Sequence, residues 1–563
     1  MRLSFVIAVD PETEKTQMFG VRYMPVWAYT LAAHLRPISD IQIFLHDTRL
    51  TSAEQIPASD IYFYSALNQD VPANIKLLKD LRAKFPQALH AIGGPATGSL
   101  KMAGRLSALD DFDGIFLGEG EGHALAFILK LKSYTEKKPL IYTPPERFDL
   151  SGSLPMDYEL LKASCNDYYG GVIEVSRGCP FLCEFCDIRT LPDNNKAHNK
   201  PIETIIKDLE QFQSLNITNV LLACDNLIGD PVWATKLCDA IIEMKARTGY
   251  RPRCYTWLTV NIVNHPDLMK KMRAAGLDMF FIGLESFGAN QLLETAKIQN
   301  TKFDLTDAVR QIQSYGIVVV AGLIFGFDSD SDETVHEALE GILKSGLISG
   351  DPTLLTALSG TPLYRRMELA GRLRHGKVAL GGLKYSTNIR YLRPKDKIIA
   401  DYTYFVATFN SASFQIKRFR SFLDCVGSQP QEKVAGYIQP GKLLSLVTKN
   451  TTAIKSASWR LAKFLASPTR ILAVAYGAIM TARHPQGAWP HYFFWVFNWS
   501  NSIIKYGNIS ERDFDIESVA GPITRQHILP AGYGEDYFEP IPHAKIKAQR
   551  QLTTRSLEKI TPP

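Results

Sequence analysis

The sequence predicts an α/β protein of three successive parts: a doubly wound parallel sheet, a partial barrel of six βα units, and a mainly helical C-terminal domain. Short apolar runs alternate with amphipathic segments over residues 1–360, which is typical of parallel βα folds. Longer apolar and aromatic segments follow in residues 361–563. The chain has 563 residues, 45% of them hydrophobic and 21% charged, so several domains with sizeable cores are expected.

Residues 1–150 predict a Rossmann-like, doubly wound sheet. Each apolar run is short and is followed by polar or glycine-rich sequence, with helical patterns such as Ile75–Phe85 between the runs. Residues 151–168 are expected to form a linker. The predicted strands are Leu3–Val9, Ile41–Leu45, Ile61–Tyr64, Leu89–Ile92 and Gly114–Leu117.

Two glycine-rich loops follow strands of this sheet and therefore lie at its carboxyl edge, where open α/β folds bind ligands. Glycine allows a backbone to approach a bulky ligand closely, although a tight turn between strand and helix would show the same pattern. The residues concerned are Gly93, Gly94 and Pro95 in the first loop, and Gly118, Glu119 and Gly120 in the second.

Residues 169–360 predict six strands with helices between them. This pattern indicates a partial parallel barrel, whose chemistry is expected at the carboxyl ends of the strands. The helices include Ile202–Leu215, Val232–Arg247, Pro266–Ala275 and Phe303–Tyr315. The strands are Val172–Ser176, Asn219–Ala223, Cys254–Val260, Met279–Leu284, Val318–Phe325 and Thr353–Leu358.

A cysteine triplet, Cys179, Cys183 and Cys186, follows the first of these strands. Three thiolates at this C-x3-C-x2-C spacing can ligate three irons of a 4Fe–4S cube and leave the fourth iron open to a substrate. A zinc site with His198 as fourth ligand, or three unrelated buried cysteines, would explain the triplet less well. The other five cysteines have no framework spacing and are expected to be buried thiols, so a reducing cytoplasm is expected.

The triplet, with an aromatic residue directly before its last cysteine, resembles the radical SAM superfamily. That resemblance implies a 4Fe–4S cluster, with S-adenosylmethionine (SAM) bound to the open iron and cleaved reductively to a 5′-deoxyadenosyl radical. It also implies SAM contacts from the cysteine loop and from the ends of later strands. These residues are Phe185, Asp225, Asn226, Glu285, Gly322, Ile324 and Gly326.

Residues from about 20 to 375 are similar to one group within that superfamily: cobalamin-binding radical SAM proteins with a C-terminal domain of unknown function, which include the hopanoid C-2 methylases. The matching stretches are Ser176–Ile188, Lys297–Asn300, Ile324–Asp330 and Ala357–Arg366. The resemblance implies that cobalamin lies on the two glycine-rich loops. An Asp-x-His-x-x-Gly motif is missing from the first loop, so no histidine from that loop is expected on cobalt, and His46 is the alternative.

Three positions depart from the pattern of that group. Cys224 stands where the group often has an acid, Trp257 stands where it often has a glutamate, and Thr190–Lys200 lacks the usual arginines. These departures leave the cluster loop intact, but they argue against assigning the substrate of the hopanoid methylases to this chain.

The expected activity is therefore cobalamin-dependent C-methylation of an unactivated carbon of a small substrate. A ring rearrangement, cyclisation or oxidation with the same cofactors is the alternative. Methylthio transfer is excluded because no cysteine precedes Cys165, and a non-catalytic scaffold would have no use for an open-iron loop. The resemblance implies a flavodoxin- or ferredoxin-type electron donor. The net charge of +6 is small for this length and does not suggest a nucleic acid partner.

The C-terminal region predicts a basic helix at Leu363–Leu373, an apolar segment at Ile454–Ala482 interrupted by Pro468, and an aromatic block at Trp489–Trp499. The block fits a helical cap with an aromatic core, a tunnel for an apolar substrate such as a lipid or terpenoid, or a peripheral membrane contact. No apolar run reaches the roughly 18–20 residues of a membrane span, and the N-terminus does not read as a signal peptide. The tail after Pro540 is expected to be poorly ordered.

Overall fold

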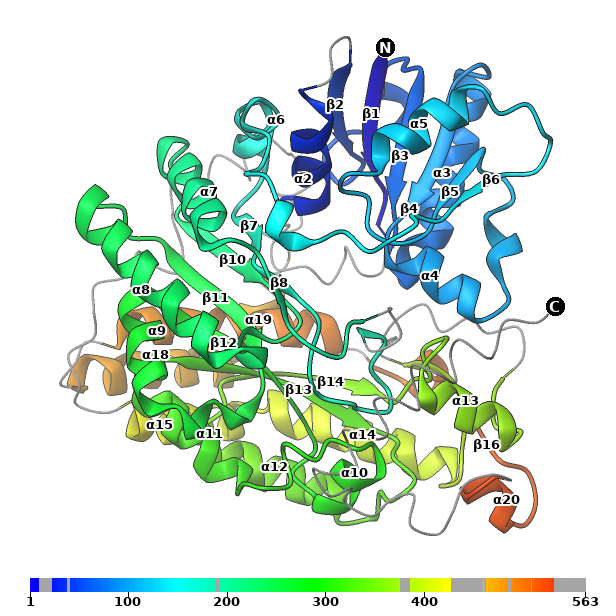
Figure 1. Ribbon diagram of the computed structural model, residues 1–563. Helices are drawn as coiled ribbons and strands as arrows, with labels where there is room; N and C mark the ends of the chain where they lie inside the picture. Colours follow the sequence, from blue (N-terminus) through cyan, green and yellow to red (C-terminus); the bar gives the residue numbers. More distant parts are fainter. Residues whose placement is uncertain are drawn as a thin grey trace.

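A computed structural model describes residues 1–9, 23–37, 41–188, 193–374, 385–426, 459, 462–484, 488–507 and 509–530. The loop after the first strand and the tail after Pro540, for which the sequence made predictions, lie outside these residues. Figure 1 shows the N-terminal sheet stacked on the barrel, with the C-terminal helices on the far side of the barrel.

The N-terminal sheet has six parallel strands in the order β2-β1-β3-β4-β5-β6, which confirms the doubly wound prediction. The strand β6 was not predicted from the sequence, because it has only three residues and Ile141 in its middle is 52% exposed. The strands are β1 Arg2–Ile7, β2 Gln42–Asp47, β3 Ile61–Ser65, β4 Leu89–Gly93, β5 Gly114–Phe116 and β6 Leu140–Tyr142.

Alternation along β1 separates the two faces of this sheet. Leu3 and Phe5 pack in the core that contains α2 (Val26–Leu35) and α5 (Ala124–Lys132). Val6 points to the opposite face. That face is covered by α3 (Val71–Lys84) and α4 (Pro95–Met102).

Residues 151–168, expected to form a linker, contain one helix that was not predicted, α6 (Tyr158–Ser164). Asp157 caps α6 by accepting a hydrogen bond from the backbone NH of Leu160, and it also forms an ion pair of 2.7 Å with Arg36. Tyr168 donates a hydrogen bond of 3.0 Å to Asp47 at the end of β2. These contacts attach the segment to the N-terminal sheet.

The second sheet is an open barrel whose six parallel strands lie in sequence order, β7-β10-β11-β12-β13-β14, as predicted. The last strand begins four residues before its prediction, because its polar start, Ser349-Gly350-Asp351, pairs with Val320–Gly322 of the neighbouring strand. The strands are β7 Gly171–Glu174, β10 Asn219–Ala223, β11 Arg253–Leu258, β12 Leu277–Glu285, β13 Val318–Phe325 and β14 Ser349–Leu354.

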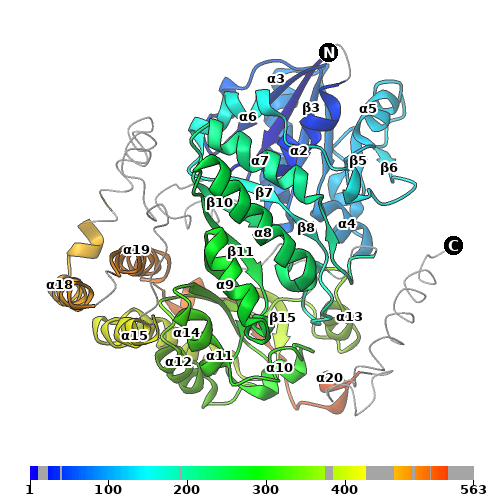
Figure 2. The same ribbon diagram turned by 60° about the vertical axis from the view of Figure 1, so that its left-hand side comes forward.

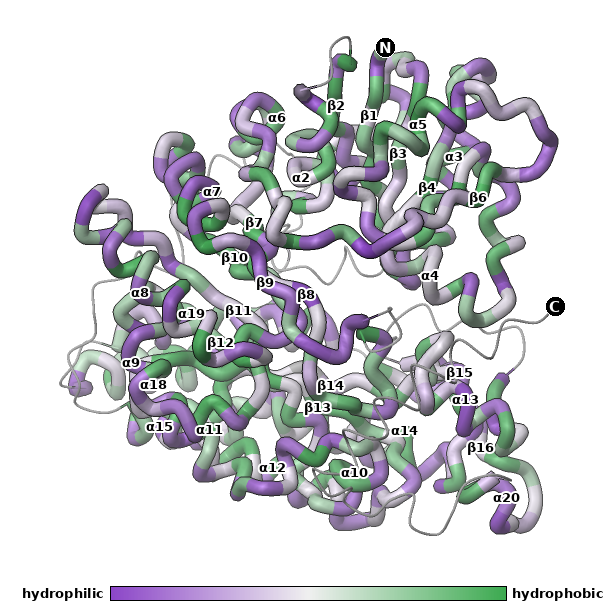
Figure 3. The backbone as a smooth tube through the Cα atoms, viewed as in Figure 1, coloured by the Kyte–Doolittle hydropathy of each residue, from purple (hydrophilic) through white to green (hydrophobic). Residues whose placement is uncertain are grey.

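Helices of the barrel cover the outside of this sheet. In Figure 3 the outer helices carry hydrophilic stretches, whereas much of the inner strands is hydrophobic. The apolar residues of these helices recur at helical spacing and face the strands, as Ile205, Leu209 and Phe212 do. The helices are α7 Ile202–Ser214, α8 Pro231–Thr248, α9 Pro266–Ala275, α10 Ala289–Glu294, α11 Leu305–Ser314 and α12 Thr334–Ser345.

The C-terminal region is mainly helical, as predicted, with one parallel pair of strands. Figure 2 shows α15, α18 and α19 side by side against the barrel. Pro468 interrupts the predicted apolar segment, as expected: the helical residues 462–465 end just before it, and Pro468 begins α18, since the first turn of a helix tolerates proline. The elements are α13 Pro362–Leu369, β15 Ser386–Tyr391, α14 Lys395–Asn410, α15 Ala412–Cys425, α18 Pro468–Arg483, α19 Trp489–Tyr506, β16 Asp515–Ser518 and α20 Arg525–Ile528.

The aromatic block forms the start of α19 and builds a core with its neighbours. Trp495 stacks on Phe419 of α15 with 4.4 Å between ring centroids. A side chain at Gly477 of α18 would meet Trp495 at 2.5 Å, so the two helices approach through this glycine. Among the described residues, no helix is long and apolar enough to cross a membrane.

Candidate functional site

A cavity of about 540 Å³ opens at the carboxyl ends of the barrel strands. All three cysteines of the triplet line it. Aromatic and aliphatic side chains make up much of the rest of its wall. The other lining residues are Val26, Glu174, Ser176, Arg177, Phe181, Phe185, Ile188, Ala223, Cys224, Asp225, Trp257, Leu258, Thr259, Phe281, Gly283, Glu285, Lys297 and Gln299.

The backbone of the cysteine loop is held in a conformation that requires glycine at its start. Gly178 has a φ of +91°, and a side chain there would lie 2.1 Å from the carbonyl oxygen of Lys196. Its backbone NH donates a hydrogen bond of 2.6 Å to the carboxylate of Asp225. Asp225 therefore anchors the loop in addition to lining the cavity.

Two amides donate to the cysteine sulfurs. The Nδ2 of Asn226 lies 3.7 Å from the sulfur of Cys179, and the Nε2 of Gln299 lies 3.5 Å from that of Cys183. Burial raises the pKa of Cys179 to about 11 and also raises that of Cys186. Such thiols become thiolates when a metal supplies positive charge, and hydrogen bonds to the sulfurs then tune the metal centre.

The donor set fits a cluster better than a single ion. Among the described residues, no three His, Cys, Asp or Glu side chains are close enough to hold one metal ion. A 4Fe–4S cube instead takes one cysteine at each of several separated corners. His198, the fourth ligand of the zinc alternative, contacts the backbone carbonyl of Asp193 at 2.7 Å and does not line the cavity.

A buried ion pair joins Glu285 and Lys297 in the cavity wall, with 2.8 Å between the charged atoms. Glu285 has a φ of +64°, where β12 shifts register against β13, and this aims its side chain at Lys297. Burial would lower the pKa of Lys297, but Glu285 and the neighbouring cysteines raise it above its ordinary value. The ammonium therefore stays charged beside the cysteine loop.

Arg177 connects the cavity with the N-terminal sheet. It forms ion pairs with Glu174 at 2.7 Å, with Glu121 at 2.5 Å and with Glu119 at 3.0 Å. Burial would raise the pKa of Glu174, but Arg177 and Lys200 lower it to about 2. The carboxyl edges of the two sheets therefore meet through a charged network at the rim of the cavity.

The structure brings only part of the predicted SAM set to the cavity wall. Phe185, Asp225 and Glu285 line it, and Asn226 lies behind Cys179. A side chain on Gly322 would lie 3.4 Å from Phe281, a lining residue.

Two further residues that were predicted to contact SAM, Ile324 in the fifth barrel strand and Gly326 just after it, do not line the cavity. Ile324 is half-buried and does not line the cavity. Gly326 has a φ of +95°, and a side chain there would collide with the ring of Tyr391 at 2.7 Å, so the packing of β15 explains this glycine.

The residues predicted for cobalamin do not line the cavity. Gly94 has a φ of +90°, and a side chain there would meet the hydroxyl of Ser65 at 2.6 Å, so sheet packing explains it. Gly93 ends β4, and Pro95 begins α4. Gly118 differs: it is exposed, with a φ of +106°, which leaves its backbone open to a ligand.

Both single-residue departures from the family pattern line the cavity. Cys224 lies 3.3 Å from the hydroxyl of Thr256, and Trp257 occupies the adjacent wall. Lys297 and Gln299 also line the cavity, but no site role was predicted for them from the sequence. Their place in the Lys297–Asn300 stretch, which matches the related group, could have indicated such a role.

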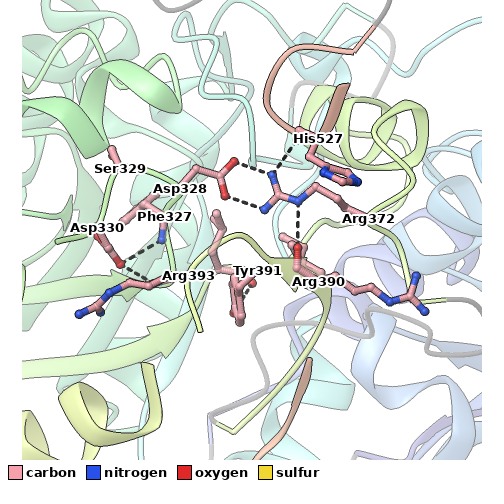
Figure 4. A network of polar contacts seen from close by, with 12 residues as sticks. Phe327, Asp328, Ser329, Asp330, Arg372, Arg390, Tyr391, Arg393 and His527 are labelled. Carbon is pink, nitrogen blue, oxygen red and sulfur yellow. Dashed lines mark hydrogen bonds and ion pairs between the residues drawn. The ribbon is translucent and has the colours of Figure 1, made fainter. Parts of the chain in front are cut away.

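The turn after β13 is fixed by the C-terminal region (Figure 4). Arg372 donates two hydrogen bonds of 2.6 Å to Asp328 and contacts the backbone carbonyls of Arg390 and His527. Asp330 accepts from the backbone NH groups of Gly326 and Phe327. The matched Gly326–Asp330 stretch is therefore a structural turn.

Comparison with family models finds two matches. Residues 173–342 match the radical SAM superfamily, and residues 361–480 match a domain of unknown function, DUF4070. The first match contains the cysteine loop and strands β10 to β13.

Several characterised proteins are similar in sequence. The hopanoid C-2 methylase of Rhodopseudomonas palustris (strain TIE-1) is 29% identical over 67% of this chain and 69% of its own length. The anaerobic magnesium-protoporphyrin IX monomethyl ester cyclase of Synechocystis sp. is 24% identical over 56% of this chain and 68% of its own length.

Two solved structures share the fold. The cobalamin-dependent SAM radical enzyme OxsB, solved with aqua-cobalamin and SAM, covers 98% of this chain and 84% of its own, with a TM-score of 0.58 and 15% identity. The radical SAM methyltransferase TsrM from Kitasatospora setae covers 66% of this chain and 77% of its own, with a TM-score of 0.53 and 15% identity.

Proposed function

The chain is a radical SAM enzyme with a DUF4070 domain, and from this premise we propose that it is a cobalamin-dependent C-methylase of an apolar small molecule. The observation that carries the proposal is one cavity lined both by the three cysteines of the triplet and by aromatic side chains such as Trp257 and Phe281. The similarity to a hopanoid C-2 methylase supports methylation as the outcome.

Cys179, Cys183 and Cys186 would hold the 4Fe–4S cluster. Together with SAM, that cluster supplies one-electron cleavage and a radical able to take hydrogen from an unactivated carbon. The residues of this chain would position the reactants. Asp225 and Glu285 offer carboxylate oxygens to the ammonium and ribose hydroxyls of SAM, and Asn226 and Gln299 orient the cysteine sulfurs.

Cobalamin would supply the methyl group from the carboxyl edge of the N-terminal sheet. The exposed backbone at Gly118 and the fold likeness to OxsB support this part of the proposal. Glu119, in the same loop, reaches the cavity rim through Arg177. Both loops, Gly93–Pro95 and Gly118–Gly120, are proposed to meet cobalamin, although in the first loop the close packing of Gly94 against Ser65 would by itself require glycine.

The substrate is proposed to be apolar, such as a lipid or terpenoid. Trp257 replaces a residue that is often acidic in the related group, and Leu258 and Phe281 line the cavity beside it. Burial of apolar surface would give the binding energy and would keep water from a reactive radical.

A peripheral membrane contact would deliver such a substrate. Leu472, Tyr476 and Ile479 form an exposed stripe on α18, and Leu472 is 70% exposed. Between Glu432 and Glu511 the sequence has nine Lys and Arg residues but no Asp or Glu, so this region carries more positive charge than the net +6 of the whole chain. An apolar stripe in a basic region suits an anionic bilayer surface.

The electron donor is proposed to be a flavodoxin or ferredoxin in a reducing cytoplasm, because the cluster needs one electron for each cleavage. A cyclisation or rearrangement is the second candidate, favoured by the similarity to the Synechocystis cyclase. The two outcomes differ in product mass. Reduced, cofactor-loaded protein incubated with methyl-labelled SAM and an apolar lipid extract should yield a labelled product one CH2 heavier than its precursor. An unlabelled product of altered mass would favour the second candidate.

A further inference from the structure

A second cavity, of about 300 Å³, lies at the opposite end of the barrel from the cysteine loop. It is lined by the starts of β12, β13 and β14 and by helices α14, α15 and α19, and it shares no lining residue with the first cavity. The residues that line it are Met279, Val320, Ile348, Ser349, Gly350, Phe409, Arg418, Phe494, Asn498, Asn501, Ser502 and Lys505.

Arg418 is the unusual member of this set, because it is a buried cation with few partners. Its side chain is 1% exposed. One guanidinium nitrogen, Nη2, donates to the backbone carbonyl of Ile348 at 2.5 Å, and the guanidinium carbon lies 4.0 Å from the ring centroid of Phe409. Its Nε and Nη1 have no hydrogen-bond partner among the described residues.

No carboxylate balances this charge among the described residues. Burial alone lowers the pKa of Arg418 to about 9, with no contribution from an acidic group. The side chain therefore remains charged at neutral pH. A buried charge without a counter-ion is strongly unfavourable, so the arrangement calls for an anion beside the two open nitrogens.

Other donors line the same cavity. The buried hydroxyl of Ser502 has no partner among the described residues, and Asn501 and Lys505 lie in the wall. The lining contains no Asp or Glu. Apolar residues such as Met279, Val320 and Phe494 complete the wall, so the space suits an anionic head with a short apolar part.

We propose that this cavity binds an oxyanion, a phosphate or carboxylate group held by the guanidinium of Arg418 and the hydroxyl of Ser502, two buried and incompletely hydrogen-bonded groups of its wall. A guanidinium presents its nitrogens in a fork that matches two oxygens of such a group. The volume is at the low end for ligand pockets and fits a small anion or a short phosphate ester. Because α15, α19 and the barrel all contribute, the anion joins the barrel to the C-terminal region.

The opposing view is that Arg418 serves packing alone, through Phe409 and the carbonyl of Ile348. The two views differ in their response to anions. A packing arginine is indifferent to added phosphate or carboxylate, whereas a site for an oxyanion gains stability when the anion binds the folded state.

Full-length protein in a chloride buffer free of other anions is titrated separately with inorganic phosphate, acetate and dihexanoyl phosphatidic acid. Calorimetry and thermal unfolding are recorded for wild type, Arg418→Met and the control Arg420→Met, which changes an arginine at the surface of the same helix. We expect one site per chain for at least one of the three probes, with Tm raised by roughly 2 °C or more at saturation. The affinity should be unchanged in Arg420→Met and at least about tenfold weaker in Arg418→Met.

Binding of inorganic phosphate or acetate would identify a free anion as the ligand, and binding of dihexanoyl phosphatidic acid alone would identify a lipid headgroup. No binding of any probe by wild type, or equal binding by Arg418→Met, would overturn the proposal. If Arg418→Met does not fold, Ser502→Val replaces it, with the same loss of affinity expected. None of these measurements depends on the cluster, so they are independent of the proposed methylation.

Discussion

Arg366 of α13 donates hydrogen bonds of 2.7 and 2.9 Å to the two carboxylate oxygens of Glu184, which lies within the cysteine loop. Both side chains are buried, and the residues are 182 positions apart. The backbone NH of Leu363 also donates to the carbonyl of Glu184. The first helix of the C-terminal domain therefore fixes the loop that carries the cysteine triplet.

Replacing Arg366 with Gln should release this loop. It leaves the buried Glu184 carboxylate without its main partner, which costs about 3–5 kcal/mol for pairs of this kind. We expect the reconstituted protein to hold less than about half of the iron of wild type and to unfold at a lower temperature. Iron assay and thermal unfolding measure both effects.

Arg365→Gln is the matched control, because Arg365 is exposed and its ion-pair partner among the described residues is Glu368 on the same helix surface. It should keep the iron content and Tm of wild type. Equal losses in the two variants would show that the Arg366–Glu184 pair has no special role in cluster retention.

Substitutions should distinguish the cysteines that ligate the cluster from a cysteine that only lines the cavity. Cys183→Ala should abolish formation of 5′-deoxyadenosine, since a cluster without this ligand cannot be held in place. Cys224→Ala, in the same cavity, should keep about four irons per chain and most of the cleavage activity. Cleavage of SAM that persists in Cys183→Ala would refute the assignment of the loop.

Trp257 is expected to affect the binding of the substrate rather than the cleavage of SAM. Trp257→Glu places a charge in an apolar wall, so we expect at least about a tenfold rise in KM for an apolar substrate. Uncoupled cleavage of SAM should change by less than about threefold. An unchanged KM, measured with the substrate found by the labelling experiment, would remove this residue from the substrate wall.

Stability should depend on pH through Asp208, which accepts a hydrogen bond of 2.7 Å from the backbone NH of Met156. Burial raises its pKa to about 7. A carboxyl with a raised pKa in the folded state favours folding at low pH, and this contribution is lost as pH rises from about 4 to about 7. Asp208→Asn keeps an acceptor and removes the charge.

The variant should therefore be more stable than wild type at pH 8, by up to about 4 kcal/mol, and the difference should shrink toward pH 5. Thermal unfolding at the two pH values checks the sign. A larger gain at pH 5 than at pH 8 would contradict the assignment.

Membrane binding should depend on the exposed stripe of α18. Leu472→Glu with Ile479→Glu should reduce binding to vesicles of phosphatidylglycerol by at least about tenfold, because each change removes apolar contact and adds a repelled charge. Val232→Glu, at an exposed apolar residue on α8, is the control and should bind as wild type does. Wild-type protein that does not sediment with such vesicles would refute the membrane contact.

Much of the fold could be predicted from periodicity, because buried parallel strands are short continuous apolar runs such as Ile61–Tyr64 and Val318–Phe325. The failures have physical causes. The strand at Leu140–Tyr142 is too short and too exposed to leave a pattern, and the start of β14 is polar. The helix within residues 151–168, which were expected to form a linker, was not predicted either, and it has only seven residues.

The candidate site was predicted less completely than the fold. The cysteine spacing is local, so the three proposed cluster ligands could be named from the sequence alone. The partners of those ligands come from distant segments, as Gln299 and Arg366 do, and no local pattern records such contacts. The ligand roles of Gly94 and Gly326 were expected from the family resemblance and stay predictions, and the sequence did not show that a side chain at these positions would collide with Ser65 and Tyr391.

The most direct test of the central claim is the ratio of iron and cobalt to protein after anaerobic cluster reconstitution with hydroxocobalamin, together with an absorbance spectrum. The two-cofactor proposal predicts about four irons and one cobalamin per chain. About four irons without cobalamin would keep the radical SAM chemistry but contradict the methylase proposal, and the N-terminal sheet would then bind something else.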